Sequence, residues 1–332
     1  MHDSDPAAEL ATRFAFGGAA GEVLRDHYEW DRDQAELSAK FRLYYRFRRF
    51  IPIPVRQLLQ KQRNQGMETP QDWYVPARFL SDFRTAVAKE PERLQIHPWP
   101  DRLEFAASLT HDVETEVGMG LIERLAAVEE EFGFRSSWNV IPHKYDVDRG
   151  LLDDLVQRGH EIGVHGYNHD GRLFESPRIF RKRTMAIKQA VREFGSVGFR
   201  APMVHRNLAW MQSLRVEYDA SCFDVDPFQA MPGGVGGVWP FIAGDFVELP
   251  YTLPQDHTLF VARGERDCST WHRKLDFLKR NHGMALMLTH PDYLNTDRSQ
   301  QLYREFLVNV RDGGGYWHVL PREVATWWTS RE

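Results

Sequence analysis

The sequence predicts an α/β fold in which a parallel sheet is closed, or nearly closed, into a barrel. From about residue 103, apolar strand-like stretches alternate with stretches of helical periodicity. Glycines such as Gly133 and Gly159 stand where two of these helices end. Polar residues follow several of the strands, and the carboxyl ends of the strands are where barrels of this kind carry their chemistry.

The expected elements follow one another in regular order. The strands are expected at 103–114, 135–142, 160–165, 197–202, 218–224, 245–252 and 284–291. The helices between them are expected at 119–133, 149–159, 177–195, 208–215 and 269–283. A glycine-rich loop at 233–237 interrupts the alternation. This order of units favours parallel strands joined by helical crossovers.

Composition excludes several classes of protein. The 332 residues suffice for a large buried core, and 42% hydrophobic with 27% charged residues is typical of folded globular proteins. Lys and Arg total 42 against 47 Asp and Glu, which argues against nucleic-acid binding. The two cysteines, Cys222 and Cys268, favour a reducing compartment. With no leader-like or membrane-spanning apolar stretch in the sequence, we expect a cytoplasmic protein.

Residues 1–100 differ from the remainder, and we interpret them as an N-terminal extension that packs on a domain formed by residues 101–332. The stretch 40–63 carries eight Lys or Arg and no acidic residue, interleaved with aromatic residues. In one interpretation, the aromatic rings pack on the main domain while the arginines reach water. In the other, the stretch contacts an anionic membrane or a phosphate-bearing, lipid-linked glycan.

Two carboxylates follow the first expected strand. Because strand side chains alternate between faces, Asp112 and Glu114 point the same way, whereas His111 and Val113 point the opposite way. Both acids can therefore enter one pocket. A purely structural role for this acidic strand end is the alternative.

Two histidines follow the third strand in the stretch GHEIGVHGYNH, residues 159–169. A helical turn would place His165 and His169 on one side, where both imidazoles could bind a divalent ion. One carboxylate would complete a triad of two histidines and an acid, leaving positions for water and substrate. The alternative is a pair of surface or hydrogen-bonded histidines. His160 lies at the opposite end of this strand, which favours a structural role.

The ordered set LTHDVE, GHEIGVHGYNH, FRAP, YDAS and LMLTHP resembles the polysaccharide deacetylase family, also called NodB-type or carbohydrate esterase family four. The resemblance covers residues 103–320, and its most specific match is the second of these motifs. It implies a distorted (β/α)7-type barrel of parallel strands. It also implies a divalent metal, usually zinc, and hydrolysis of acetyl groups on sugars.

The first motif departs from the family's usual Thr-Phe-Asp-Asp, because Thr110-His111-Asp112-Val113-Glu114 has no adjacent pair of acids. It is similar to an Asp-x-Glu variant. On this resemblance Asp112 is the general base and Glu114 joins His165 and His169 as metal ligands, although the two acids could exchange roles.

The resemblance also assigns the later motifs. Arg200 would pair with Asp112 and hold it ionised, although an ordinary surface ion pair is the alternative. His290 would be the general acid, a task that suits imidazole because its pKa lies near neutrality. Of the three carboxylates in YDASCFDVDPF, Asp219 is preferred as the partner of His290 over Asp224 and Asp226.

The resulting expectation is a zinc-dependent enzyme that removes an acetyl group from an N-acetylated sugar in a polysaccharide, oligosaccharide or glycan precursor. Formamides, O-acetyl esters and cyclic amides remain open as substrates, because some relatives hydrolyse them. The alternative of a different class is a catalytically silent glycan-binding protein that retains the fold. The altered first motif motivates that alternative.

Overall fold

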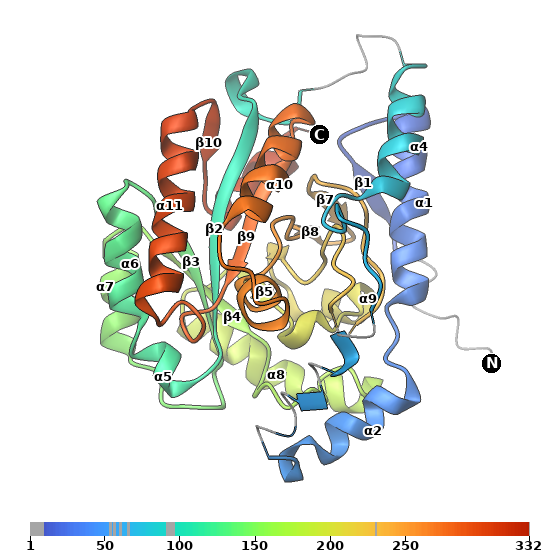
Figure 1. Cartoon of the computed structure of the whole chain (residues 1–332). Coiled ribbons are helices and arrows are strands. Elements are labelled where there is room, and N and C mark those ends of the chain that lie inside the picture. The colour runs from blue at the N-terminus through green and yellow to red at the C-terminus, as the bar shows by residue number, and fades with distance from the viewer. Residues whose placement is uncertain are drawn as a thin grey trace, which may run out of the picture.

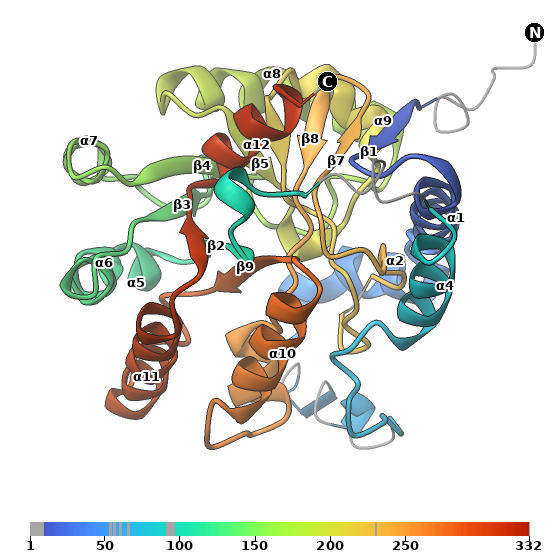
Figure 2. The same ribbon diagram turned by 90° about the horizontal axis from the view of Figure 1, so that it is seen from above.

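A computed structural model of the chain describes residues 10–52, 55, 58–59, 62–64, 67–90, 97–229 and 231–331. It confirms the α/β class: a sheet curls into a distorted barrel, and helices surround it (Figures 1 and 2). The strands are β1 Thr12–Phe14, β2 Phe105–Val113, β3 Ser136–Val140, β4 Glu161–His165, β5 Gly198–Arg200, β6 Tyr218–Asp219, β7 Phe241–Ala243, β8 Phe246–Glu248, β9 Met284–Thr289 and β10 Tyr316–His318.

The α-helices of the described residues begin in the N-terminal extension and continue around the barrel. They are α1 Gly18–Gln34, α2 Ala39–Phe47, α4 Ala77–Val87, α5 Glu116–Met119, α6 Ile122–Glu131, α7 Arg149–Gln157, α8 Pro177–Glu193, α9 Leu208–Met211, α10 Ser269–Arg280, α11 Asp297–Gly313 and α12 Pro321–Thr329. Short helical turns are η2 Arg48–Phe50, η4 Pro100–Arg102, η5 Pro202–Val204, η6 Gln212–Leu214 and the π-helical η7 His257–Ala262. Within the described ranges, no helix combines the length and the apolar character needed to cross a bilayer.

Most of the sheet is parallel. Strands β8, β6, β5, β4, β3 and β2 lie side by side in that order, and β9 and β10 both pair with β2. In the chain after β8, Leu253 forms an isolated parallel β-bridge with Met287 of β9. The curled sheet therefore approaches closure between β8 and β9. The carboxyl ends of the parallel strands therefore meet at one mouth, toward the bottom of Figure 1.

Strand β2 has more strand partners than any other described strand of this sheet. It pairs with three strands, and all nine of its residues are buried. Every residue of β3, β4 and β9 is buried as well. Parallel strands covered on both faces have this pattern. The strand ends that carry the polar motifs are consequently held by the most buried part of the fold.

Some expected elements are shorter than their sequence patterns indicate. The strand expected at 218–224 is regular only over β6, followed by a single bridge between Phe223 and Tyr251. The helix expected at 119–133 is regular only over α6, and the separate short helix α5 precedes it. The short strands β1, β7 and β10 and the helices α11 and α12 were not predicted.

The described part of the N-terminal extension packs on the barrel. Strand β1 pairs antiparallel with β7, and α1 and α4 lie along that side of the sheet (Figure 1). The rings of Phe79 and Phe83 on α4 pack against Trp239 within the main hydrophobic core.

A buried ion pair fixes α1 to the barrel. The Arg206 guanidinium donates to both carboxylate oxygens of Asp31, with Nε to Oδ2 at 3.1 Å, and both side chains are buried. Asp31 also accepts from the backbone N–H of Gly234 at 2.6 Å. The carboxylate thereby links the extension to two loops of the barrel.

Replacing Asp31 with alanine should destabilise the protein strongly, because it leaves the Arg206 charge buried without its partner. We expect the free energy of unfolding to fall by about 3–5 kcal/mol, measured by urea denaturation. The matched control is Asp245→Ala, which breaks the exposed pair with Arg215 and should cost less than about 1 kcal/mol. Equal losses in the two variants would contradict a structural role for the buried pair.

Candidate active site

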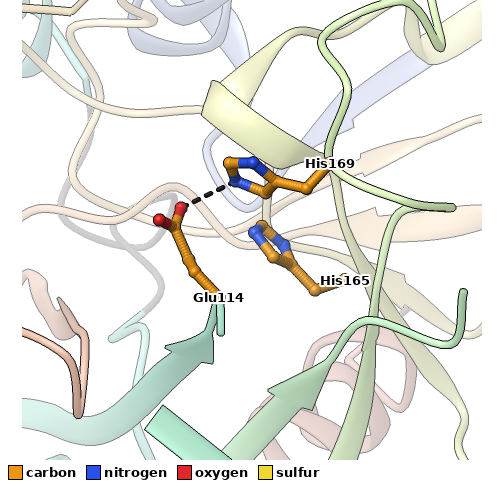
Figure 3. Close-up of side chains that lie close together, drawn as sticks. All are labelled: Glu114, His165 and His169. Atoms are coloured by element: carbon orange, nitrogen blue, oxygen red, sulfur yellow. Dashed lines mark ion pairs between the residues drawn. The ribbon is translucent and has the colours of Figure 1, made fainter. Parts of the chain in front are cut away.

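Three potential metal ligands meet at the mouth of the barrel. Glu114 directly follows β2, His165 ends β4, and His169 lies in the loop after β4 (Figure 3). One ligand atom from each residue lies within 4.8 Å of the other two. The closest pair is His169 Nε2 and Glu114 Oε1, at 2.7 Å. The structure therefore brings together the two imidazoles and the carboxylate that the sequence assigned to one ion.

The two histidines meet through a loop and not through the expected helical turn. Residues 166–171 form no helix, and His169 has a φ of 56°, in the left-handed region. Gly166 also has a positive φ, 67°, and a Cβ there would lie 2.3 Å from the Cδ of Pro202. The ring centroids of His165 and His169 nevertheless lie 5.3 Å apart. This tight, glycine-dependent reversal brings His169 back over the end of β4.

The donor set fits a divalent metal. His165 donates from Nδ1 to the backbone carbonyl of Arg200 at 3.1 Å, which leaves the Nε2 lone pair facing Glu114. Among the described residues, the buried Nε2 of His165 has no hydrogen-bond partner, and the buried Nε2 of His169 faces the Glu114 carboxylate at 2.7 Å. Burial lowers the pKa of His165 to about 4, so its imidazole is neutral at neutral pH. Two imidazoles and one carboxylate form a ligand set typical of catalytic zinc.

Asp112 lies beside this group in a buried network. Its Oδ1 accepts from Arg200 Nη1 at 3.1 Å and from Asn139 Nδ2 at 3.0 Å, and its Oδ2 lies 3.6 Å from His165 Nε2. Arg200 Nη1 also donates to Thr110 Oγ1. Burial raises the pKa of Asp112, but attraction to His165 and Arg200 outweighs it and holds that pKa below its usual value. Asp112 is thus an ionised carboxylate with one oxygen anchored.

Asn139 was not singled out from the sequence. It belongs to β3 and is the register partner of Asp112 on β2, so the two side chains leave the sheet together. A Cβ at Gly163 of β4, the next strand, would lie 1.9 Å from Asn139 Oδ1. Glycine at this position of the GHEIGVH strand therefore makes room for the amide that holds Asp112.

His290 follows β9 and lies on the same side of the barrel. Its Nδ1 contacts Asp256 Oδ1 at 2.7 Å, and its backbone N–H donates to Asp256 Oδ2 at 2.8 Å. Burial lowers the pKa of His290, but Asp256, together with Glu114 and Asp112, raises it to about 9. His290 is therefore protonated at neutral pH, which suits a proton donor.

The prediction that Asp219 is the partner of His290 is wrong. Asp219 accepts from the hydroxyl and backbone N–H of Ser221, and its strand β6 is separated from β9 by the chain that follows β8. Asp256 lies in that chain, three residues after the bridge from Leu253 to β9, and so reaches His290.

The other two carboxylates of the same motif also have partners elsewhere. Asp224 pairs with the buried Lys274, and Asp226 accepts from Tyr251 at 3.2 Å and from Thr258 at 3.3 Å. Neither contacts His290. All three acids of this motif are therefore buried and have partners other than His290.

The remaining histidines of the motifs, His111 and His160, also have buried partners away from the site. His111 faces away from the site, where its Nε2 lies 2.6 Å from Glu129 Oε1 and its Nδ1 lies 2.8 Å from Thr289 Oγ1. His160 accepts from the backbone N–H of Ser136 at 3.0 Å. Both side chains are fully buried, so the alternation along β2 separates a structural imidazole from the carboxylates of the mouth.

Comparison with solved structures identifies the fold. A protein assigned as a polysaccharide deacetylase from Mycobacterium smegmatis superposes with a TM-score of 0.58 at 21% identity, over 70% of this chain and 93% of that one. A second, from Pseudomonas aeruginosa PAO1, gives 0.54 at 15% identity, over 73% and 95%. The Puue allantoinase gives 0.53 at 15% identity, over 80% and 98%.

No protein-family model and no curated protein sequence matches the chain. The structural likeness shows that the chain has the NodB-type fold of polysaccharide deacetylases, and confirms the distorted barrel expected from the motifs. At these identities the likeness concerns the fold alone.

The pKa of His290 should depend on Asp256 and not on Asp219. In NMR titrations of the metal-free protein, we expect the His290 imidazole to titrate near pH 9. Asp256→Asn removes the negative charge that favours the imidazolium, so the pKa should fall toward the ordinary value of about 6.5. Asp219→Asn is the matched control and should leave it near pH 9. The reverse pattern would restore the assignment made from the sequence.

Proposed function

We propose that the protein is a metal-dependent hydrolase that removes an acetyl group from an N-acetylated sugar of a polysaccharide, oligosaccharide or glycan precursor. One observation carries the proposal. Two buried imidazole nitrogens converge on one carboxylate, beside an anchored carboxylate and a protonated imidazole. An unreactive binding surface has no need of this combination of buried groups, each of which is costly to bury alone.

Glu114, His165 and His169 would hold the ion. Zinc is the metal that this nitrogen and oxygen donor set suits best. Bound there, a divalent ion supplies Lewis acidity, which polarises an acyl oxygen and lowers the pKa of a water molecule. The Nδ1–H of His165 already donates to the Arg200 carbonyl, so its Nε2 needs no reorientation to act as a ligand.

Asp112 is the general base in this proposal. Arg200 and Asn139 both engage its Oδ1, which leaves Oδ2 to accept a proton from an attacking water molecule. The alternative exchange of roles is disfavoured because Glu114 Oε1 lies 2.7 Å from His169 Nε2, whereas Asp112 Oδ2 lies 3.6 Å from His165 Nε2. Arg200 therefore acts through Asp112, by keeping it ionised and fixed.

His290 is the general acid. Its proton on Nε2 can pass to the leaving amine, while Asp256 orients the ring from Nδ1 and stabilises its charged form. Base and acid come from separate strands, β2 and β9, which pair directly with each other. Substrate would bind across the mouth between them.

The glycan substrate is supported by the fold of two assigned polysaccharide deacetylases. The third neighbour, an allantoinase, requires that a cyclic amide be tested beside acetylated sugars. A suitable panel contains N-acetylhexosamine oligosaccharides, acetylated sugar nucleotides, an N-formyl sugar and allantoin. Release of acetate and a free amine from a sugar would support the proposal, and turnover of allantoin alone would contradict it.

Metal binding should require the two histidines of the mouth. We expect His169→Ala to lose at least about 10-fold in zinc affinity, because it removes one of three ligands. Competition against a chromogenic chelator and elemental analysis measure the affinity and the stoichiometry. His282→Ala, at the amino end of β9 on the opposite side of the barrel, is the control and should bind zinc as the unmodified protein does. Unchanged zinc binding in His169→Ala would contradict the assigned ligands.

Turnover should depend on Asp112 and His290 without a parallel loss of metal. We expect Asp112→Asn and His290→Ala each to lower kcat/KM by about 10²- to 10⁴-fold, because each removes a proton-transfer group. Zinc content, measured in parallel, should be retained. If the protein binds acetylated glycans but turns over no member of the panel, the hypothesis of a catalytically silent glycan-binding protein is correct and the enzyme hypothesis is wrong.

A further inference from the structure

We propose that helix α2 and the residues after it form a docking surface for an anionic lipid bilayer, with the mouth of the barrel held beside the membrane. The docking surface comprises α2, η2 and the described residues that follow them up to Leu59. It is a surface distinct from the candidate metal site.

The first observation is a concentration of exposed apolar side chains. Six large hydrophobic residues between positions 43 and 59 are exposed, more than on the whole remainder of the described chain: Leu43, Phe47, Phe50, Val55, Leu58 and Leu59. Leu43 is 59% exposed and Phe47 is 49% exposed. They lie four residues apart on α2 and therefore share one face of the helix. Single exposed apolar residues are ordinary, but a gathered set marks an interaction surface.

The second observation is the charge of the same segment. Residues 40–63 contain eight Lys or Arg and no acid, although the whole chain has a net charge of −5. Lys40, Arg42 and Arg46 on α2 are exposed beside the apolar residues. An amphipathic helix with apolar and basic residues on its outer surface is typical of proteins that lie in the headgroup region of anionic membranes.

The third observation is where the inner face of α2 is attached. Tyr45 is buried, and its ring lies 4.9 Å from that of His205, centroid to centroid. Its Cδ1 occupies the space beside Gly171, two residues beyond the proposed ligand His169. Arg48 contacts Met203 of the turn after β5. Figure 1 accordingly shows α2 at the end of the barrel where the parallel strands finish.

Charge also decides between a bilayer and a second copy of the chain. A two-fold contact through this surface would bring the same basic segment of both copies together, without an acidic residue in it to compensate. An anionic bilayer offers apolar depth for Leu43 and Phe47 and negative charge for the surrounding cations. If the proposed hydrolase is correct, this placement favours substrates whose sugar is carried on a lipid.

The test uses the full chain and vesicles without any sugar substrate. Cosedimentation is measured with phosphatidylcholine alone and with about three parts in ten of phosphatidylglycerol. We expect binding only to the anionic vesicles, and weaker binding as salt rises. Leu43→Ser/Phe47→Ser and Arg42→Glu/Arg46→Glu should each weaken the affinity at least about 10-fold.

Matched controls change the same residue types on other surfaces. Val156→Ser/Met185→Ser removes exposed apolar side chains from α7 and α8, and Arg192→Glu/Arg280→Glu reverses exposed charges near the carboxyl ends of α8 and α10. Both controls should bind anionic vesicles as the unmodified protein does. Thermal melting of every variant shows that each is folded.

Several results would overturn the docking surface: absence of vesicle binding, equal binding to neutral vesicles, or equal losses in variants and controls. Self-association that the α2 variants abolish, without vesicle binding, would assign the surface to a second copy instead. Asp112→Asn should bind vesicles normally, so failure of the hydrolytic proposal and failure of this one are separable.

Discussion

The alternation of side chains along β2 is the constraint on which the site depends. This strand pairs with β3, β9 and β10, so its orientation is fixed from both edges. Asp112 faces the mouth, while His111 on the opposite face reaches Glu129 in the helical layer. A shift of one residue in register would exchange the two faces and put an imidazole where the carboxylate is needed. Glu114, two positions beyond Asp112, returns to the same side and reaches His169, so the proposed site does not need two adjacent acids.

Much of the fold and site could be predicted from local pattern. Buried parallel strands read as apolar runs, and polar residues that follow such strands converge at one edge whatever loops intervene. That geometry brought Glu114, His165 and His169 together from two motifs, and Arg200 to Asp112 from a third. The ordered motifs indicated the barrel type even though no whole-sequence match supports it.

The inference that failed was that the carboxylate partner of His290 would lie within one of the ordered motifs. Asp219 stands in a motif of the expected order, but the chain after β8 lies between β6 and β9 and brings Asp256 to His290 instead. Asp256 precedes a π-helical turn and has no periodic context that would distinguish it. Asn139 could have been found by aligning β2 with β3 in register, because it stands directly across from Asp112. The three-residue strand β1 is too short for any periodicity to reveal.

Two histidines of the proposed site, His165 and His290, show how environment sets the protonation state of one side-chain type in opposite directions. His165 hydrogen-bonds to a neutral carbonyl, so burial dominates, its pKa falls to about 4, and a lone pair is available to an ion. His290 contacts a buried carboxylate, which outweighs burial, raises its pKa to about 9 and retains a proton. The proposed ligand and the proposed acid thus have different partners on Nδ1, a carbonyl and a carboxylate. Because the partner of each comes from a different part of the chain, the division of roles depends on barrel closure as much as on the histidines themselves.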